Sequence, residues 1–561
     1  MGMHSQCANF AAKTHIMIRH AIAAAVAAVA AMGHAQPADN NFNAAKNLQV
    51  LSSAYKALDM GYVDTIDAGK TLRYAIDAML KSLDPYTAYY SEEDMDDLKY
   101  RYTGTYAGIG AVIRRNMQTG EVYIEQPSEG MPAAIAGLRK GDVVLEIDGE
   151  PMAGRKQDYV SEKLRGTAGT TFSLKYRRPA TGKVQAVRIT RQAIRSKSVP
   201  YYAMLSGGTG YILIDGFTEN TARDTRQAFA QLKRQGMQSL IIDLRGNGGG
   251  LEQEAVEIVG MFVPKGRLIV QNKGKTPRSS HDFYATEAPV DTVMPIVVAV
   301  DRASASASEI TAGALQDMDR AAIVGERTFG KGLVQATAPL PYNGSLTMTV
   351  SKYYIPSGRC IQAVDYSRRG EGAEADTART FRTAAGRIVK EKGGISPDCE
   401  VPDTISSLSA YLTQLVDSHE VVHNYVMSYM AAHPSIPAPG DFELTDGDFQ
   451  EFKRQAVASG FTYDRATEKI LEGLVRAAKI EGYYDAAKDE LEALQGKLKH
   501  DLEKELDFKK DELMELLGEQ IATAYHLQTG GIAYSLKHDR VVRKALALLA
   551  SPDEYRRLLQ P

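Results

Sequence analysis

The spacing of hydrophobic residues changes along the chain, and each spacing predicts a different kind of element. In the central third, apolar runs at 210–217, 239–245 and 295–300 predict buried strands, and amphipathic stretches at 220–235 and 251–262 predict helices. Alternating strands and helices imply an α/β domain whose sheet has parallel members, with functional loops at strand-to-helix turns.

Two flanking regions have helical patterns instead. Between residues 43 and 99 apolar residues recur at helical spacing, and 405–561 is rich in Lys, Glu and Asp. An apolar stripe at helical spacing crosses this second region: Leu491, Leu494, Leu498, Leu502 and Leu506. We expect an N-terminal helical segment over 36–100 and a charged helical C-terminal domain over 405–561. The helical regions should pack against the α/β domain or against a second subunit in a homo-oligomer.

The composition narrows the class of protein. Of the 561 residues, 44% are hydrophobic and 24% are charged, which is typical of a soluble protein of several domains. A formal charge of −3 implies no nucleic acid or other polyanion as partner. Cys360 and Cys399 form no metal-binding pair, and both a bridge between them and two unpaired thiols remain open. The sequence indicates no metal and no cofactor.

The start of the chain has the pattern of a secretory signal peptide. A basic Met17-Ile-Arg-His20 precedes the apolar Ala21–Met32, and small residues follow up to Ala35. The apolar stretch is too short and too rich in alanine for a convincing membrane-spanning helix. We expect a signal peptide over 1–35, with the start at Met17. The mature protein should then be exported, periplasmic or extracytoplasmic, and without a stable membrane anchor.

Candidate chemistry follows the strand at 295–300. Three serines, Ser304, Ser306 and Ser308, lie between this strand and an alanine-rich helical stretch. A serine at such a turn lies near unpaired backbone N–H groups at the positive end of a helix, which suits a nucleophile and an oxyanion.

A serine nucleophile needs a base. His281 is the only histidine between residues 36 and 404, and no sequence signal ties it to the serines. Lys331, between two glycines and apolar flanks, could lose its proton readily if it is held away from water. On residue types alone, a helix-capping Ser306 and a surface Lys331 fit equally well.

The longer pattern resembles the C-terminal processing, or tail-specific, peptidases. The family's S-A-S-A-S-E-I, G-A-L-Q-D and V-G-x-x-T-F-G-K-G-x-V-Q segments match 304–310, 313–317 and 324–335. The family uses a Ser–Lys dyad in which the lysine follows the middle serine by 25 residues, which selects Ser306 and Lys331 here.

The resemblance also implies supporting residues. The family glutamine that orients the lysine corresponds to Gln335, and the D-L-R-x-N-x-G-G loop supplies an oxyanion-hole N–H. Here that donor is Gly249 or Gly250, with the N–H of Ala307 as its partner. Leu83-Asp-Pro-Tyr86 resembles a turn ahead of the family's peptide-binding domain, and we interpret it as scaffold.

Residues 101–195 resemble a PDZ domain. Glycines precede a strand at Gly108-Ile109-Gly110, where free backbone N–H groups can hold a carboxylate. The segments 132–138, 140–149 and 164–176 follow in the order typical of PDZ domains. We expect this loop to bind the free C-terminus of a protein or peptide substrate.

One motif in the helical region belongs to another class of enzyme. His419-Glu420-Val-Val-His423 matches H-E-x-x-H, in which two histidines one helical turn apart bind Zn²⁺ and the glutamate acts as base. Val426 and Tyr429 stand where the metzincin extension has Gly and His, and no further ligand is evident.

The sequence therefore predicts a multidomain α/β (α+β) protein. A mixed-sheet serine protease core over 196–404 carries an inserted PDZ domain over 101–195, with helices on both sides. The expected activity is that of an exported serine endopeptidase, which recognises C-terminal or unfolded segments and cleaves through an acyl-enzyme formed by a Ser–Lys dyad. The alternatives are a zinc peptidase and a non-catalytic PDZ scaffold.

Overall fold

The computed structural model describes residues 38–366, 379–391, 393–402, 406–413, 420–463, 465–498 and 501–561, so the expected signal peptide lies outside it. The chain forms two compact units. Unit 1 contains the segments up to Gly104, from Tyr202 to Glu400 and from Ala545 onward; unit 2 contains Thr105–Tyr201 and Val401–Lys544. The helical region expected over 405–561 thus contributes to both units.

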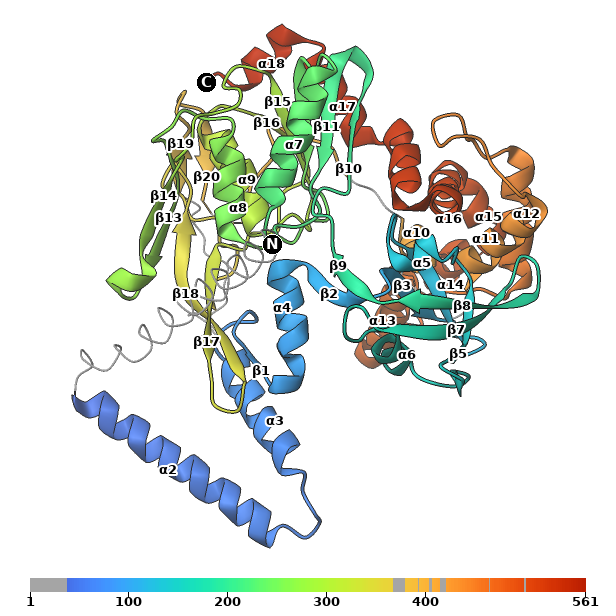
Figure 1. The fold of residues 1–561 in the computed structure, drawn as a ribbon, viewed down its shortest axis with the longest axis horizontal. Helices are drawn as coiled ribbons and strands as arrows, with labels where there is room; N and C mark the ends of the chain where they lie inside the picture. The colour runs from blue at the N-terminus through green and yellow to red at the C-terminus, as the bar shows by residue number, and fades with distance from the viewer. Residues whose placement is uncertain are drawn as a thin grey trace, which may run out of the picture. The chain divides into compact units, whose positions relative to one another are not determined.

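Unit 1 is built on a six-stranded sheet in the order β10-β11-β12-β15-β16-β21, parallel from β11 to β21 (Figure 1). Its strands are β10 (Tyr201–Met204), β11 (Thr209–Leu213), β12 (Ser239–Asp243), β15 (Ile296–Val300), β16 (Ala322–Gly325) and β21 (Cys399–Glu400). The helices beside it are α7 (Thr221–Arg234), α8 (Glu252–Gly260) and α9 (Ala307–Asp317). Every residue of β12 and β15 is buried, which is why the sequence shows continuous apolar runs there.

A second sheet in unit 1 is antiparallel. It has the order β1-β18-β13-β14, and β17 also pairs with β18. Its strands are β1 (Ala88–Tyr90), β13 (Leu268–Gly274), β14 (His281–Tyr284), β17 (Leu333–Pro339) and β18 (Ser345–Tyr354). The short strands β19 (Thr380–Arg382) and β20 (Ile388–Lys390) form a separate pair. The mixed α/β architecture expected from the sequence is confirmed.

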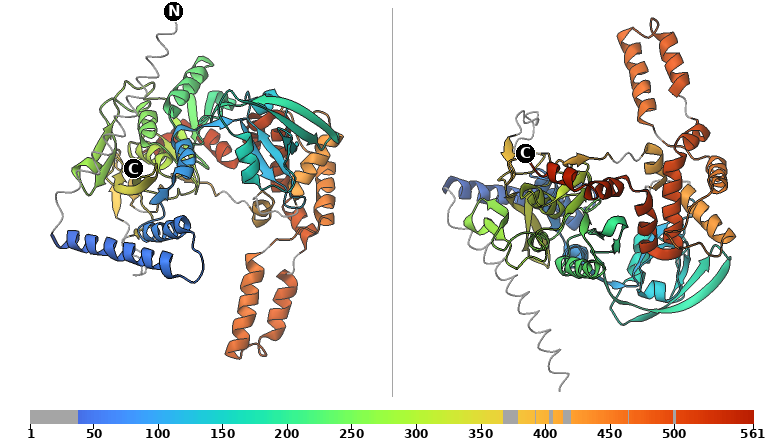
Figure 2. Two further views of the ribbon diagram at one scale, coloured as in Figure 1. Left: turned by 60° about the horizontal axis from the view of Figure 1, so that its bottom comes forward. Right: turned by 90° about the horizontal axis from the view of Figure 1, so that it is seen from above.

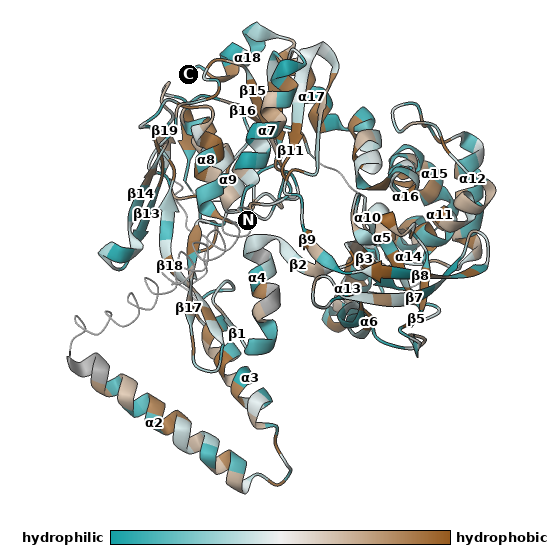
Figure 3. Cartoon of the chain, viewed as in Figure 1, coloured by the Kyte–Doolittle hydropathy of each residue, from teal (hydrophilic) through white to brown (hydrophobic). Residues whose placement is uncertain are grey.

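The ends of unit 1 are helical. The N-terminal helices are α2 (Ala38–Gly61), α3 (Ala68–Lys81) and α4 (Met95–Thr103), and the C-terminal ones are α17 (Arg540–Leu549), which begins in unit 2, and α18 (Pro552–Leu558). Hydrophobic residues are exposed along α2, among them Phe42, Leu48 and Met60 (Figure 3). None of the described helices is long and apolar enough to cross a bilayer.

Unit 2 begins with the PDZ domain. Its sheet has the order β3-β4-β5-β7-β8, with β6 paired to β5, and β2 pairs with β9. The strands are β2 (Thr105–Gly108), β3 (Ala111–Arg115), β4 (Val122–Pro127), β5 (Val143–Ile147), β6 (Glu150–Pro151), β7 (Thr171–Arg178), β8 (Lys183–Thr190) and β9 (Gln192–Arg195). Two helices, α5 (Pro132–Ile135) and α6 (Gln157–Leu164), complete the domain.

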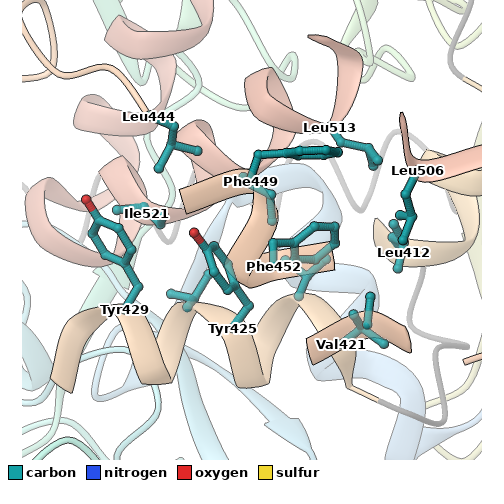
Figure 4. Close-up of a cluster of buried hydrophobic side chains, with 14 of the residues drawn as sticks. Leu412, Val421, Tyr425, Tyr429, Leu444, Phe449, Phe452, Leu506, Leu513 and Ile521 are labelled. Carbon is teal, nitrogen blue, oxygen red and sulfur yellow. The ribbon is translucent and has the colours of Figure 1, made fainter. Parts of the chain in front are cut away.

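The rest of unit 2 is the helical domain. It consists of α10 (Ser407–Thr413), α11 (Val421–Ala432), α12 (Asp446–Ala458), α13 (Ala466–Glu481), α14 (Lys488–Leu498), α15 (Leu502–Phe508) and α16 (Lys510–His538). Aromatic and aliphatic side chains such as Tyr425, Phe449, Phe452 and Leu513 form its core (Figure 4). Helices α13 and α14 lie side by side as a hairpin (Figure 2).

The leucine stripe over 491–506 does not lie on one helix. The stripe is divided between α14, which ends at Leu498, and α15, which begins at Leu502. Asp501 accepts a hydrogen bond from the backbone N–H of Lys504 and caps the second helix. A polar residue that caps a helix thus interrupts a stripe whose spacing is otherwise continuous.

Candidate active site

Ser306 occupies a strained turn between β15 and α9. Its φ of 56° and ψ of −114° are unusual for a residue other than glycine, and α9 begins at the next residue. Ser304 and Ser308 are fully buried, and their hydroxyls donate to backbone carbonyls of Leu244 and Asn247 at 2.8 and 2.9 Å. Ser306 is only half-buried. Burial therefore separates the middle serine from its neighbours.

The glycine-rich loop after β12 packs against this turn. A Cβ at Gly249 would lie 2.8 Å from the Cβ of Ser306 and 2.9 Å from the backbone nitrogen of Ala307, and φ there is 97°. The N–H of Ala305 donates to the carbonyl of Asn247 at 3.0 Å and fixes the loop from the serine side. Only glycine at position 249 lets the two loops come this close.

The predicted oxyanion donors differ in their hydrogen bonding. The N–H of Gly249 donates to Oδ1 of Asn247 at 2.8 Å. The N–H groups of Gly250 and Ala307 have no acceptor among the described residues. Ala307 is the first residue of α9, where backbone N–H groups lack partners within the helix.

A buried glutamate joins the serine turn to the lysine loop. Oε2 of Glu309 accepts hydrogen bonds from the backbone N–H of Ser306 at 2.9 Å and of Lys331 at 2.8 Å. Its Oε1 accepts from the hydroxyl of Thr328 at 2.5 Å and the N–H of Gly330 at 2.8 Å. Glu309 has no exposed surface, and burial raises its pKa against these hydrogen bonds. Ser306 and Lys331 are thereby held against one carboxylate oxygen.

A tyrosine joins the same two residues from their carbonyl side. The hydroxyl of Tyr353 on β18 donates to the carbonyl of Lys331 at 2.6 Å and lies 3.2 Å from the carbonyl of Ser306. The side chain is almost fully buried, and burial raises its pKa well above the ordinary value, so the hydroxyl remains a donor. The backbone of both residues is thus fixed on two sides.

The amine of Lys331 lies over an aromatic ring. Its Nζ is 4.6 Å from the centroid of Tyr86, which meets Tyr366 edge-on at 6.1 Å between centroids. Burial lowers the pKa of Lys331, and the carboxylates of Glu309 and Asp84 act against that shift. Among the described residues no carboxylate forms an ion pair with Nζ. This environment favours a neutral amine more than water does.

The turn at residues 84–87 presents Tyr86 to the lysine. Oδ1 of Asp84 accepts from the N–H groups of Tyr86 and Thr87, both at 2.8 Å. The N–H of Thr349 on β18 donates to the hydroxyl of Thr87 at 3.2 Å, which anchors the turn to the antiparallel sheet. The segment Leu83–Tyr86, which the sequence predicted to be scaffold, therefore also places an aromatic ring against the amine of Lys331.

Gln335 and His281 lie elsewhere. The amide of Gln335, on β17, donates to the hydroxyl of Thr349 at 3.2 Å, and in the described residues it has no hydrogen bond to Lys331. Its orienting role stays a prediction. His281 is exposed on β14, and its Nε2 lies 2.8 Å from the carbonyl of Arg278. No hydrogen bond in the described chain links it to Ser306.

The predicted carboxylate-binding loop lies between β2 and β3. The backbone N–H groups of Ile109 and Gly110 have no acceptor among the described residues. Ile109 is buried in the PDZ core, and Gly110 has a φ of 67° at a point where a Cβ would lie 2.4 Å from the Cβ of Met131. The glycine is therefore required for the shape of the loop, and Gly108 before it ends β2.

The H-E-x-x-H motif does not form a zinc-peptidase helix in the described residues. Helix α11 begins at Val421, and Glu420 precedes it with a left-handed φ of 51°. His419 lies outside the described residues. The ring of His423 packs on Tyr123 at 4.2 Å between centroids, and burial lowers its pKa to about 4. In the described part of the chain no group of three or more His, Cys, Asp or Glu side chains could hold a metal ion.

Three contributors to the site were not predicted: Glu309, Tyr353 and Tyr86. Glu309 follows Ser306 by three residues, which is the S-x-x-E spacing of a capping box, and that pattern could have indicated it. No local signal singles out Tyr353 or Tyr86, because their contacts come from separate elements. Cys360 and Cys399 are both free thiols.

A serine in a strained strand-to-helix turn beside a half-buried lysine, in a chain that also contains a PDZ domain, defines a serine peptidase of α/β type. The chain matches the family models for Peptidase family S41 over 208–401, a PDZ domain over 123–178, and the C-terminal helical domain of probable PDZ-proteases over 412–549. Each of these models covers one part of the molecule described above.

Individual relatives agree with these matches. The carboxy-terminal-processing protease of Bartonella bacilliformis is 34% identical over 342 residues, which cover 60% of this chain and 78% of the relative. The carboxy-terminal processing protease CtpB of Bacillus subtilis is 34% identical over 319 residues, 56% of this chain and 66% of its own length. The solved photosystem II D1 C-terminal processing protease is 29% identical, with 62% and 92% coverage and a TM-score of 0.33. This chain belongs to the carboxy-terminal processing proteases of peptidase family S41, which are serine peptidases.

Proposed function

We propose that this chain is an exported endopeptidase that cleaves peptide bonds with Ser306 as nucleophile and Lys331 as general base. One observation carries the proposal: the N–H groups of both residues donate to the same carboxylate oxygen of Glu309. Two residues 25 positions apart in the sequence are thus held next to each other, on either side of a fully buried side chain.

The chemistry follows from the lowered pKa of Lys331. The neutral amine removes the proton from Oγ of Ser306, and the oxygen attacks the carbonyl carbon of the substrate. The negative charge on the carbonyl oxygen is stabilised by backbone N–H groups, for which Ala307 and Gly250 are the unoccupied candidates. The ammonium returns the proton to the leaving amine, and water then hydrolyses the acyl-enzyme with the same lysine as base.

Substrate recognition is assigned to the loop Gly108–Gly110. Two unoccupied N–H groups beside a strand edge suit a terminal carboxylate, with an apolar last side chain next to it. An amidated substrate lacks that charge and should be cleaved more slowly at low concentration. Equal rates for the acid and amide forms would show that the PDZ domain does not recognise free C-termini.

Export is supported by the pattern at residues 17–35. N-terminal sequencing of protein secreted or released from the periplasm should begin just after Ala35. Uncleaved protein found only in the cytoplasm would contradict the proposal.

The deciding experiment is hydrolysis of an unstructured protein by purified enzyme. Ser306→Ala should abolish cleavage while circular dichroism stays unchanged, and a fluorophosphonate should label Ser306 but neither Ser304 nor Ser308. Undiminished cleavage by Ser306→Ala, or loss of cleavage with a chelator that zinc reverses, would overturn the assignment. An inert wild-type protein that still binds tails would support the scaffold alternative.

A further inference from the structure

Within unit 2, a cavity of about 530 Å³ lies between the PDZ domain and the helical domain. Four consecutive residues of β3, Val112 to Arg115, line it. Successive side chains of a strand point to opposite faces of its sheet, so one cavity can touch four in a row only along the edge of the strand. In the described residues β3 pairs with β4 alone, and its other edge is open.

The opposite wall of the cavity comes from the helical domain. Leu412 of α10, Val422 and Val426 of α11 and Gln520 of α16 line it. Leu412 and α11 belong to the core of the helical domain (Figure 4). This wall is therefore part of a packed domain and not a loose segment.

Buried polar contacts fix this wall to the PDZ domain. The carboxylate of Glu420 accepts from the N–H of Met117 at 3.0 Å and lies 3.8 Å from the guanidinium of Arg114. Glu420 is 1% exposed and keeps a left-handed backbone, which is costly for a residue other than glycine. Since these contacts join segments about 300 positions apart, the two domains enclose the cavity as one body.

The cavity continues the predicted tail-binding groove. The loop Gly108–Gly110 directly precedes β3, and at the far end of the strand the N–H of Arg115 donates to Oε1 of Gln157 on α6 at 3.2 Å. A C-terminal tail whose carboxylate is held by the loop, and which pairs with the open edge of β3, would run through the cavity. About 3.3 Å separate successive residues, so only a tail of more than three residues reaches Arg115.

We propose that the helical domain forms the second wall of the substrate groove and selects the residues before the end of the tail. This inference rests on the proposed recognition of free C-termini by the PDZ loop. A tail paired with β3 alternates its side chains, so the second and fourth residues from the end face the helical wall if the last one enters the PDZ pocket.

The chemistry of the cavity favours apolar side chains and disfavours cationic ones. Both carboxylates that line the cavity have cationic partners: Glu420 is close to Arg114, and Glu125 forms an ion pair with Lys140. The rest of the lining combines aliphatic side chains with polar ones, which are Arg115, Gln157, His423 and Gln520. A cationic residue fourth from the end would lose water without gaining a free carboxylate, whereas an anionic one could approach the guanidinium of Arg115, whose Nε donates to the carbonyl of Gly120.

Binding of labelled tail peptides to full-length Ser306→Ala protein tests this. We expect a peptide of eight residues to bind at least about tenfold more tightly than its last three residues alone, because one or two more apolar side chains are buried. Lysine at the fourth position from the end should remove most of this gain, because both carboxylates of the cavity already have cationic partners. Cleavage does not contribute, because the nucleophile is absent.

Variants that fill the cavity distinguish selection by the helical wall from recognition of free C-termini by the PDZ loop. Gln520→Trp, which fills the cavity from α16, should abolish the gain from length and leave the three-residue peptide unchanged. Gln528→Trp, at an exposed position of α16 beyond the break in the helix at His526 and Leu527, is the matched control. Val112→Trp fills the cavity from the exposed side chain of β3 and serves if Gln520→Trp does not fold.

Equal binding of both peptides, with no effect of either filling variant, would overturn the inference while recognition by the PDZ loop stands. An equal loss for both peptides in a folded filling variant would overturn it too. If the Ser306→Ala protein without a filling substitution bound neither peptide, the proposed recognition of free C-termini would be refuted instead.

Discussion

Each of the two units of this protein contains a buried glutamate that joins separate segments of that unit. The two glutamates differ in the kind of partner that each one binds. Glu309 in unit 1 accepts four hydrogen bonds, all from uncharged donors, and none of the described cations forms an ion pair with it. Glu420 in unit 2 accepts from the backbone N–H of Met117 at 3.0 Å and lies 3.8 Å from the guanidinium of Arg114. Both side chains are at most 1% exposed.

The difference reflects what each glutamate joins. Glu420 connects two domains, where a nearby cation offsets the cost of burying its charge. Glu309 connects the proposed nucleophile to its proposed base, and a cation bound to it would have to lie beside Lys331. Neutral donors fix the geometry there, although the carboxylate charge raises the pKa of the lysine somewhat against burial. In the proposed catalytic site the carboxylate of Glu309 thus opposes deprotonation of Lys331, but it fixes the positions of Ser306 and Lys331.

The largest effect should come from the lysine itself. Lys331→Arg keeps the positive charge but cannot supply a neutral base, so turnover should fall by about 10²–10⁴-fold, as far as in Lys331→Ala. In the wild type, activity should rise with pH through the lowered pKa of Lys331, because the deprotonated amine is the working form. Near-normal turnover of an unstructured protein by folded Lys331→Arg would return attention to His281.

A smaller but still large loss is expected at Glu309. Glu309→Ala leaves four buried donors without an acceptor and should lower turnover by up to about 10²-fold, since small misplacements of reacting groups cost that much. Glu309→Gln retains the shape and removes the charge, so part of the activity should return.

The pH profile distinguishes position from charge in these variants. Without the carboxylate charge the pKa of Lys331 should fall, and the acidic limb of the rate profile should move to lower pH in Glu309→Gln. A limb that stays in place, or moves to higher pH, would show that Glu309 does not act on the lysine electrostatically.

Tyr86 should have an effect of a few-fold. Its ring face favours the charged lysine by roughly 0.5–1 kcal/mol, so Tyr86→Leu should also shift the acidic limb to lower pH. Turnover at high pH should decline modestly, because the amine of Lys331 loses its contact with the aromatic ring. Tyr86→Phe, which keeps the ring, is the control and should retain the wild-type profile; an identical shift in both variants would implicate the hydroxyl instead.

The smallest effect on turnover is expected in unit 2. Glu420→Ala removes the hydrogen bond from Met117 and the carboxylate 3.8 Å from Arg114, which should destabilise unit 2 by about 1–3 kcal/mol. Hydrolysis of a short substrate without a free C-terminus should be unchanged. Calorimetry would detect the lower unfolding temperature of Glu420→Ala. Glu490→Ala, at an exposed position, is the control. Equal unfolding temperatures of the two variants would show that the contact does not stabilise the unit.

The sequence by itself determined the elements and the candidate nucleophile and base. Continuous apolar runs indicated β12 and β15 because strands buried on both faces have no polar alternation. Ser306 and Lys331 were selected by the resemblance of residues 304–335 to a family motif of fixed spacing, since residue types alone left both open. Turns and periodicities are properties of neighbouring residues, so one sequence is enough to detect them.

Only the tertiary structure decided which of these pieces meet. Glu309 and Glu420 each belong to a recognisable motif, a capping box and H-E-x-x-H, but neither motif indicates burial, which depends on partners 22 and 303 positions away. The same holds for the ring of Tyr86 over Lys331, and for the single unit formed by the PDZ and helical domains. Periodicity specifies the face that an element buries, but the partner of that face is chosen by the packing of the whole chain.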